Sequence, residues 1–169
     1  MKFAITLLLP VTLFFSGCAG YHMGAARPKF MGDIQTIAVE PVKNDTMEPR
    51  LEILAANTII KQIQQDGTYK IAPKDTADAI LTTTITKIER DPARGVRGNV
   101  IATREFNLIL TMKFQVTRRV SGAVVESSAT EGRTSFFVGN DVQQEERQAL
   151  PLACENAAIR MVSQITEGW

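Results

Sequence analysis

The sequence has little of what catalysis and metal binding need. Its 169 residues include a single histidine, two cysteines and one tryptophan, and no Gly-rich phosphate loop, HExxH, GxSxG or CxxC motif occurs. Cys18 is the predicted lipidation site, so Cys154 and His22 are the only cysteine and histidine that remain. These two cannot supply the four ligands of a structural zinc ion. His22 lies in a glycine-containing stretch, where catalytic geometry is hard to hold. We therefore predict that the chain is not an enzyme and carries no metal and no cofactor.

An excess of charge of either sign is also missing. The chain has 19 basic and 18 acidic residues, whereas general nucleic-acid binding needs a strongly basic face. We expect no nucleic-acid partner. Paired carboxylates suited to acid–base catalysis are lacking too, because Glu145 and Glu146 are neighbours on a predicted helix and point in different directions. We interpret both as structural.

The one long apolar run lies at the N-terminus and is too short to cross a membrane. After Lys2 it extends from Phe3 to Phe15, broken by two threonines and a proline, whereas a spanning helix needs ~20 apolar residues. Such a run behind a positive charge is typical of a secretory signal. The small residues Ser16 and Gly17 then precede Cys18, and the segment resembles a bacterial lipobox with phenylalanine in place of the usual leucine.

These features predict a lipoprotein in which residues 1–17 are removed and Cys18 carries the lipid. Stable attachment takes more than one acyl chain, which a triacylated cysteine supplies. An aspartate directly after the lipidated cysteine is the usual signal for retention in the inner membrane. Residue 19 is alanine, so we expect an outer-membrane anchor on the periplasmic side. Residues 18–32 are expected to form a tether. Cys154 then has no disulfide partner, and we expect a buried, inert thiol.

About 150 residues remain, which suits one domain, residues 33–169, with a core of its own. Strands are expected at residues 36–42, 69–72, 79–89, 104–118 and 123–136, with turns at residues 43–46 and 120–122 and a loop at residues 90–98. The strand from Arg104 to Arg118 alternates apolar and polar residues, as a strand with one face on a core requires. We predict burial of its apolar members: Phe106, Leu108, Leu110, Met112 and Phe114.

Two amphipathic helices are expected. The first opens at Glu48–Pro49 and ends at Asp66–Gly67, with an apolar stripe widened by Ile53. The second is capped by Asn140–Asp141, with Gln144 completing a capping box, and Pro151 should kink it or mark its start.

The element order is thus β-α-β-β-β-β-α. It predicts an α+β fold, a two-layer sandwich in which a mostly antiparallel sheet of four to five strands carries both helices on one face.

Basic residues gather around the predicted loop that precedes the alternating strand. Arg90, Arg94 and Arg97 fall within eight residues, and Arg118 and Arg119 end the strand that follows. The planar fork of arginine binds phosphate at two points, so these five residues are candidates for phosphate binding. The alternative is a solvated loop whose acidic neighbours neutralise it.

The chain resembles the LptE family of lipopolysaccharide-assembly lipoproteins. The resemblance begins with the Gly-Tyr-His triplet at residues 20–22 and continues through Ile37–Pro49, Gln65–Gly67 and Ala77–Leu81. It implies a small α/β sandwich that sits as a plug inside a large outer-membrane β-barrel, LptD. There it would assist folding of the barrel and delivery of lipopolysaccharide to the outer leaflet. The family's capacity to bind lipopolysaccharide through basic residues gives the five arginines a candidate ligand.

A different group of periplasmic lipoproteins shares part of this pattern. A strand of the Ile-Ala-Val-x-Pro type, a helix and an Ala-Asp-Ala-Ile-Leu-Thr strand also occur in lipoproteins related to secretion-pore subunits and to activators of peptidoglycan synthases. That alternative makes the chain a pore component or an enzyme regulator.

Overall fold

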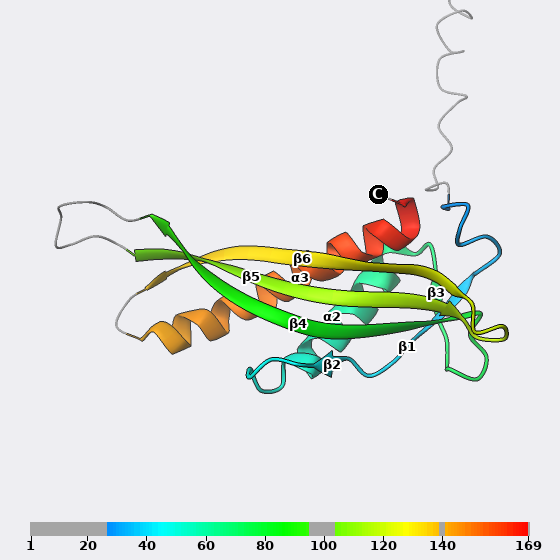
Figure 1. Cartoon of the computed structure of the whole chain (residues 1–169), viewed down its shortest axis with the longest axis horizontal. Helices are drawn as coiled ribbons and strands as arrows, with labels where there is room; N and C mark the ends of the chain where they lie inside the picture. Colours follow the sequence, from blue (N-terminus) through cyan, green and yellow to red (C-terminus); the bar gives the residue numbers. More distant parts are fainter. Residues whose placement is uncertain (1–26, 95–103, 139–140, 169) are drawn as a thin grey trace, which may run out of the picture.

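The computed structural model describes residues 27–94, 104–138 and 141–168. Cys18, His22 and Arg97 lie outside these ranges. The described chain is a long, twisted sheet with two helices packed on one face (Figure 1). This confirms the predicted α+β sandwich.

Three long strands form most of the sheet: β4 (Ala79–Arg94), β5 (Arg104–Arg118) and β6 (Val124–Val138). They pair in antiparallel fashion in that order. The turn between β5 and β6 contains Gly122, whose φ of 69° suits glycine and whose N–H donates to Arg118 O at 2.9 Å. The hairpin predicted at residues 120–122 is therefore confirmed.

Three short strands extend the sheet on the other side of β4: β1 (Thr36–Val39), β2 (Lys43–Asn44) and β3 (Lys70–Ile71). Their pairings are parallel, β3 with β1 and both β1 and β2 with β4. The sheet therefore has six strands instead of the four to five expected. Most of its paired residues are antiparallel, as predicted, and the parallel pairs are confined to the short strands. Residues 43–44, predicted as a turn, pair with Thr84 and Ile85, and β1 ends at Val39, just before Pro41, which cannot donate to a ladder.

Strand β4 continues through residues 90–94, which were predicted to be loop. Pro92 is tolerated there because β1 and β2 pair only with the first half of β4, so this part of β4 has an open edge.

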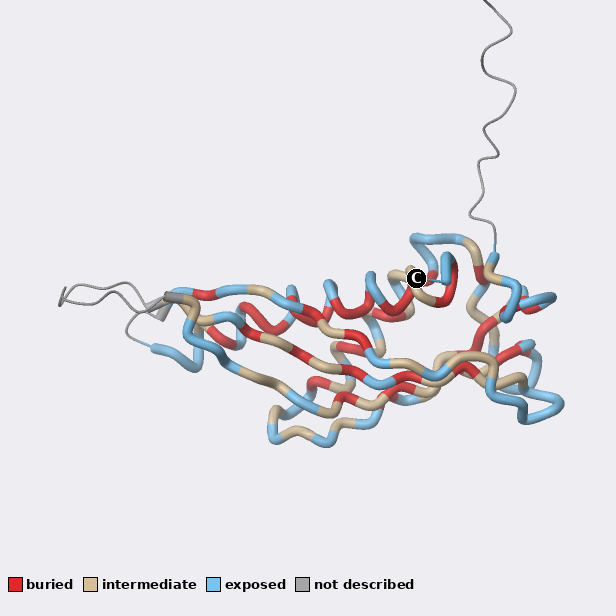
Figure 2. Tube along the Cα trace, turned by 45° about the horizontal axis from the view of Figure 1, so that its top comes forward, coloured by how far each residue is buried: buried red, intermediate tan, exposed pale blue. Residues whose placement is uncertain are grey.

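The alternating strand β5 behaves as predicted on its helix-covered face. Leu108, Leu110 and Met112 are fully buried and Phe114 nearly so, while Phe106 is half-buried and stacks on Phe136. Figure 2 shows buried and more exposed positions alternating along the long strands. The helix-free face of the sheet carries mostly polar side chains, among them Thr82, Thr84, Thr111, Gln115 and Ser127.

Helix α2 (Leu51–Asp66) begins two residues later than predicted, because Arg50 adopts a left-handed conformation (φ 64°) and serves as the N-cap. Its buried stripe consists of Leu51, Ala55, Ile59 and Ile63. Ile53 was expected in this stripe but is 59% exposed, since its position on the helix points away from the sheet. Gly67 ends the helix as predicted, with φ 75°.

Helix α3 (Val142–Glu167) runs through Pro151 without ending there. The side chain of Asp141 caps it, as predicted, by accepting from the N–H groups of Gln143 and Gln144. The helix packs closely on β6 at Gly132, where an added Cβ would lie 1.8 Å from Ala153 O. Cys154 is fully buried as expected, and burial raises the pKa of its thiol to about 12.

Candidate functional site

The five arginines predicted to bind phosphate do not form one patch. Arg90 lies opposite Leu108 near the far end of β4, whereas Arg118 lies opposite Ala79 at the other end of the sheet. The ten positions along β5 between these two points correspond to about 33 Å. Arg94 follows Arg90 on the same strand, with its backbone opposite Glu105. The sequence therefore places basic groups at both ends of the sheet.

Arg90 is bonded within the fold. Its Nε donates to Glu146 Oε2 at 2.7 Å, and a terminal nitrogen donates to the other carboxylate oxygen. These bonds raise the pKa of Arg90. The Glu146 side chain is 12% exposed and that of Arg90 is 45% exposed. Glu146 also lies in the second turn of α3, near the positive end of the helix dipole. The pair fastens β4 to α3.

The role of Glu146 as the partner of Arg90 was not predicted, although the sequence contains a signal for it. Glu146, Leu150, Ala153 and Ala157 are spaced by four, three and four residues, which places all four on one face of a helix. The last three are buried, and Glu146 taken as a whole residue is 9% exposed. A carboxylate in an apolar stripe indicates a cationic partner.

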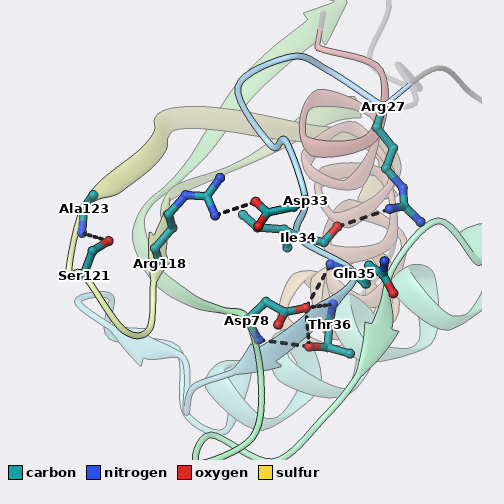
Figure 3. A network of polar contacts seen from close by, with 9 residues as sticks. All are labelled: Arg27, Asp33, Ile34, Gln35, Thr36, Asp78, Arg118, Ser121 and Ala123. Atoms are coloured by element: carbon teal, nitrogen blue, oxygen red, sulfur yellow. Dashed lines mark hydrogen bonds and ion pairs between the residues drawn. The ribbon is translucent and has the colours of Figure 1, made fainter.

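The two arginines at the other end also form hydrogen bonds within the fold, and Figure 3 shows that of Arg118. Arg118 donates to Asp33 Oδ1 at 2.8 Å, and this bond lowers the pKa of Asp33. The Asp33 side chain is largely exposed, so the pair is a weak constraint. Arg119 Nε donates to Ala77 O at 2.7 Å. Both guanidinium groups are thus held near the point where the N-terminal segment joins the sheet.

Asp78 organises this end of the molecule. Its Oδ2 accepts from Gln35 N at 3.0 Å, Thr36 N at 2.9 Å and Thr36 Oγ1 at 2.8 Å (Figure 3). The bond from Gln35 N, followed by those from Thr36, lowers the pKa of the Asp78 carboxyl. These bonds join the start of β1 to the start of β4.

A clamp around Arg27 fixes the first described residues. The Arg27 guanidinium donates to Thr68 O at 3.2 Å and to Ile34 O at 3.4 Å, and lies 5.7 Å from the centre of the Tyr69 ring. The Tyr69 hydroxyl donates to Ile165 O in the last turns of α3. Met31, in the range expected to be tether, is fully buried, so core packing begins before residue 33.

The described residues contain no cluster of three or more histidine, cysteine, aspartate or glutamate side chains that could hold a metal ion. None of the helices in residues 27–94, 104–138 and 141–168 is long and apolar enough to cross a membrane.

Comparison with known families gives one match that covers most of the fold. The family model described as "LptE: Lipopolysaccharide-assembly" matches residues 34–165, from two residues before β1 to the last turn of α3. No curated protein matches the sequence significantly.

Several solved structures share the fold at low sequence identity. The PelC dodecamer from Paraburkholderia phytofirmans is 18% identical, with a TM-score of 0.53 over 78% of this chain and 89% of that one. Protein XCC0632 from Xanthomonas campestris is 11% identical, with a TM-score of 0.57 over 80% and 85%. A minor lipoprotein from Acinetobacter baumannii is 14% identical, with a TM-score of 0.52 over 78% and 92%. At these identities the similarity concerns the fold alone.

Proposed function

The chain belongs to the LptE family, and from that premise we propose that it is the lipid-anchored partner of a large outer-membrane β-barrel of the LptD type. It helps this barrel to assemble, and it helps the barrel to deliver lipopolysaccharide to the outer leaflet. The observation that carries this proposal is the family match, which extends over residues 34–165. It includes both helices and all six strands.

The two faces of the sheet support the role of a barrel plug. The helices cover one face, while the other presents hydroxyl and amide groups from β4 and β5, such as Thr82, Thr84 and Gln115. The interior of a large outer-membrane barrel is polar. A polar sheet face can pack there without leaving apolar groups in water.

The anchor is proposed to be the lipidated Cys18, which lies outside the described residues. Mass spectrometry of the mature N-terminus tests it. We expect a triacylated cysteine in the wild type and an unlipidated precursor in Cys18→Ser, because a hydroxyl cannot replace the thiolate nucleophile. An unmodified wild-type N-terminus, or cleavage elsewhere, contradicts the proposal.

The partner is tested by purifying the lipidated protein in mild detergent and identifying the chains that co-purify. One large β-barrel at equal stoichiometry supports the proposal. A homo-oligomeric ring or a peptidoglycan synthase would instead favour the second candidate, a secretion-pore component or synthase activator. The fold shared with the PelC dodecamer is the observation on the side of that alternative.

Contact with lipopolysaccharide is proposed for Arg94, whose backbone ends β4, and for Arg97, which lies outside the described residues. Arg90 belongs to the same candidate set but is bonded to Glu146, so it should be varied separately. Arg94→Ser with Arg97→Ser should weaken lipopolysaccharide binding, more strongly at low salt, while binding to the barrel stays near normal. Arg118→Ser with Arg119→Ser probes the opposite end. Unchanged binding in both pairs would assign the lipid to the barrel alone.

A further inference from the structure

A groove runs along the seam between α2 and α3. It consists of three adjoining cavities of about 400, 570 and 200 Å³. The first and second share Glu48, Pro49 and Arg147, and the second and third share Leu54 and Pro151. Because neighbouring cavities share lining residues, they form one depression from the start of α3 to the last turn of α2. We call it the α2–α3 groove.

The groove has the length of a short extended peptide. Arg50 lines its central cavity and Gln65 its last cavity. The fifteen positions between them correspond to about 22 Å of helix, which is the length of roughly seven residues of extended chain.

The central cavity has an apolar floor with positive charge beside it. Leu51 and Leu150 are buried beneath it and Leu54 is half-buried. Arg50 and Arg147 line the same cavity from α2 and α3, and neither forms an ion pair within the described part of the chain. Glu48 is the one carboxylate among the residues that line it. The net charge of the wall therefore favours an acidic ligand.

An exposed apolar side chain lies in the groove itself. Val142 lines its first cavity and is 45% exposed. Leu54, which is half-buried, lines the central cavity. Apolar side chains that line a groove are typical of a surface that binds a partner.

The backbone of the groove favours a peptide over an acyl chain. Arg147 and Pro151 both line one wall of the central cavity. In a regular helix the N–H of residue 151 would donate to the Arg147 carbonyl, but Pro151 has no N–H, so this carbonyl lacks its helical donor. On the opposite wall α2 starts without a side-chain cap, which leaves its first N–H groups without an acceptor among the described residues. A peptide can satisfy both kinds of group, whereas an acyl chain can satisfy neither.

We propose that the α2–α3 groove binds an extended acidic peptide segment of a partner protein. The segment would place an apolar side chain on the floor of the central cavity and a carboxylate between Arg50 and Arg147. This site goes beyond the proposed barrel and lipopolysaccharide function, because its central cavity lies on the helix side of the molecule and is lined by none of the five candidate arginines. Arg90 lines the first cavity, where it is bonded to Glu146.

Selection from a library of random 12-residue peptides on the mature protein, in a fixed mild detergent, tests the proposal. We expect selected peptides to carry aspartate or glutamate next to leucine, isoleucine or phenylalanine. Fluorescence polarisation should then show that Arg147→Glu weakens binding roughly tenfold or more, the size expected for one charge-assisted contact. Arg160→Glu is the matched control, because Arg160 is an exposed arginine of α3 outside the groove.

A second variant separates binding from folding. Pro151→Ala returns an N–H to the Arg147 carbonyl and suits a helix interior better than proline does. It should therefore preserve or raise stability while it weakens peptide binding severalfold. The proposal is overturned by selected peptides without acidic residues, or by equal loss of binding in Arg147→Glu and Arg160→Glu. It is also overturned if lipopolysaccharide displaces the peptides, which would make the groove a lipid site.

Discussion

The guanidinium of Arg90 contacts both carboxylate oxygens of Glu146, which joins the far half of β4 to the second turn of α3. Beyond Ile85 the strand no longer has β1 or β2 beside it. The pair therefore closes α3 over the part of the sheet that has the least support from other strands.

The two halves of this pair should not be equivalent. Arg90→Ala leaves a mostly buried carboxylate without its partner, and we expect a loss of roughly 1–3 kcal/mol in the free energy of unfolding. Glu146→Ala leaves a guanidinium that is already 45% exposed and can turn to water, so its cost should be about 1 kcal/mol or less. Urea unfolding measures both. The double variant should lose less than the sum of the single variants, and strictly additive losses would show that the two side chains do not interact.

Strand β5 offers a direct test of the sheet's two faces. Leu110 is fully buried under the helices, and Thr111 points to the helix-free face. Leu110→Ala should cost about 2–5 kcal/mol, because it leaves a cavity in a packed core. Thr111→Ala should cost far less, as substitutions outside the core usually do. Similar shifts of the urea midpoint at both positions would mean that the helix-free face is covered as tightly as the other.

Gly132 should tolerate no side chain. A Cβ at this position would lie 1.8 Å from Ala153 O and 2.6 Å from Ala157 N, both in the backbone of α3. Because backbone cannot rotate away as a side chain can, Gly132→Ala should force α3 off β6 at a cost of about 3 kcal/mol. Ser127→Ala on the same strand, at an exposed position, is the control. A melting temperature for Gly132→Ala equal to that of the control would contradict this close contact.

Asp78 should make the protein sensitive to acid. Its pKa is lowered from the ordinary value of 3.8 by the bonds that it accepts from Gln35 and Thr36. As the pH falls, the unfolded chain takes up a proton at Asp78 first, at the ordinary pKa. The contribution of Asp78 to stability is therefore complete above that pKa, and it is lost as the pH falls through the lower pKa of the folded state. Asp78→Asn should be less stable than the wild type at neutral pH and approach it in strong acid.

Urea unfolding at a series of pH values measures this difference. The exposed Asp75, which accepts no hydrogen bond within the described residues, gives the control Asp75→Asn. A constant gap between Asp78→Asn and the wild type down to strong acid would show that the charge of Asp78 contributes nothing.

Much of the fold could be predicted because it depends on local patterns. The alternation of β5 fixes its two faces, and Gly67, Gly122 and Asp141 each end or begin an element for a local physical reason. The parallel pairings of the short strands could not be predicted in this way. They depend on which segments meet in space, and two-residue strands such as β3 carry no periodicity of their own.

The candidate site was harder to predict for the same reason. Arg90 begins the predicted loop and Arg118 ends the strand that follows it, and the length of β4 and β5 places the two at opposite ends of the sheet. The bond between Arg90 and Glu146 joins residues 56 positions apart. Contacts at that separation follow from topology and register, which composition and spacing do not contain.

The clamp around Arg27 has a mechanical consequence. A pull on the chain before residue 27 first loads the contacts of Arg27 with Thr68 and Tyr69, and through the Tyr69 hydroxyl it reaches the C-terminal end of α3. Beyond the clamp, β1 is bonded in parallel to β3 on one side and β4 on the other. Force along β1 would therefore act in shear, on all of these hydrogen bonds at once, instead of opening them one after another. The end of the domain nearest the proposed anchor is built to hold under tension.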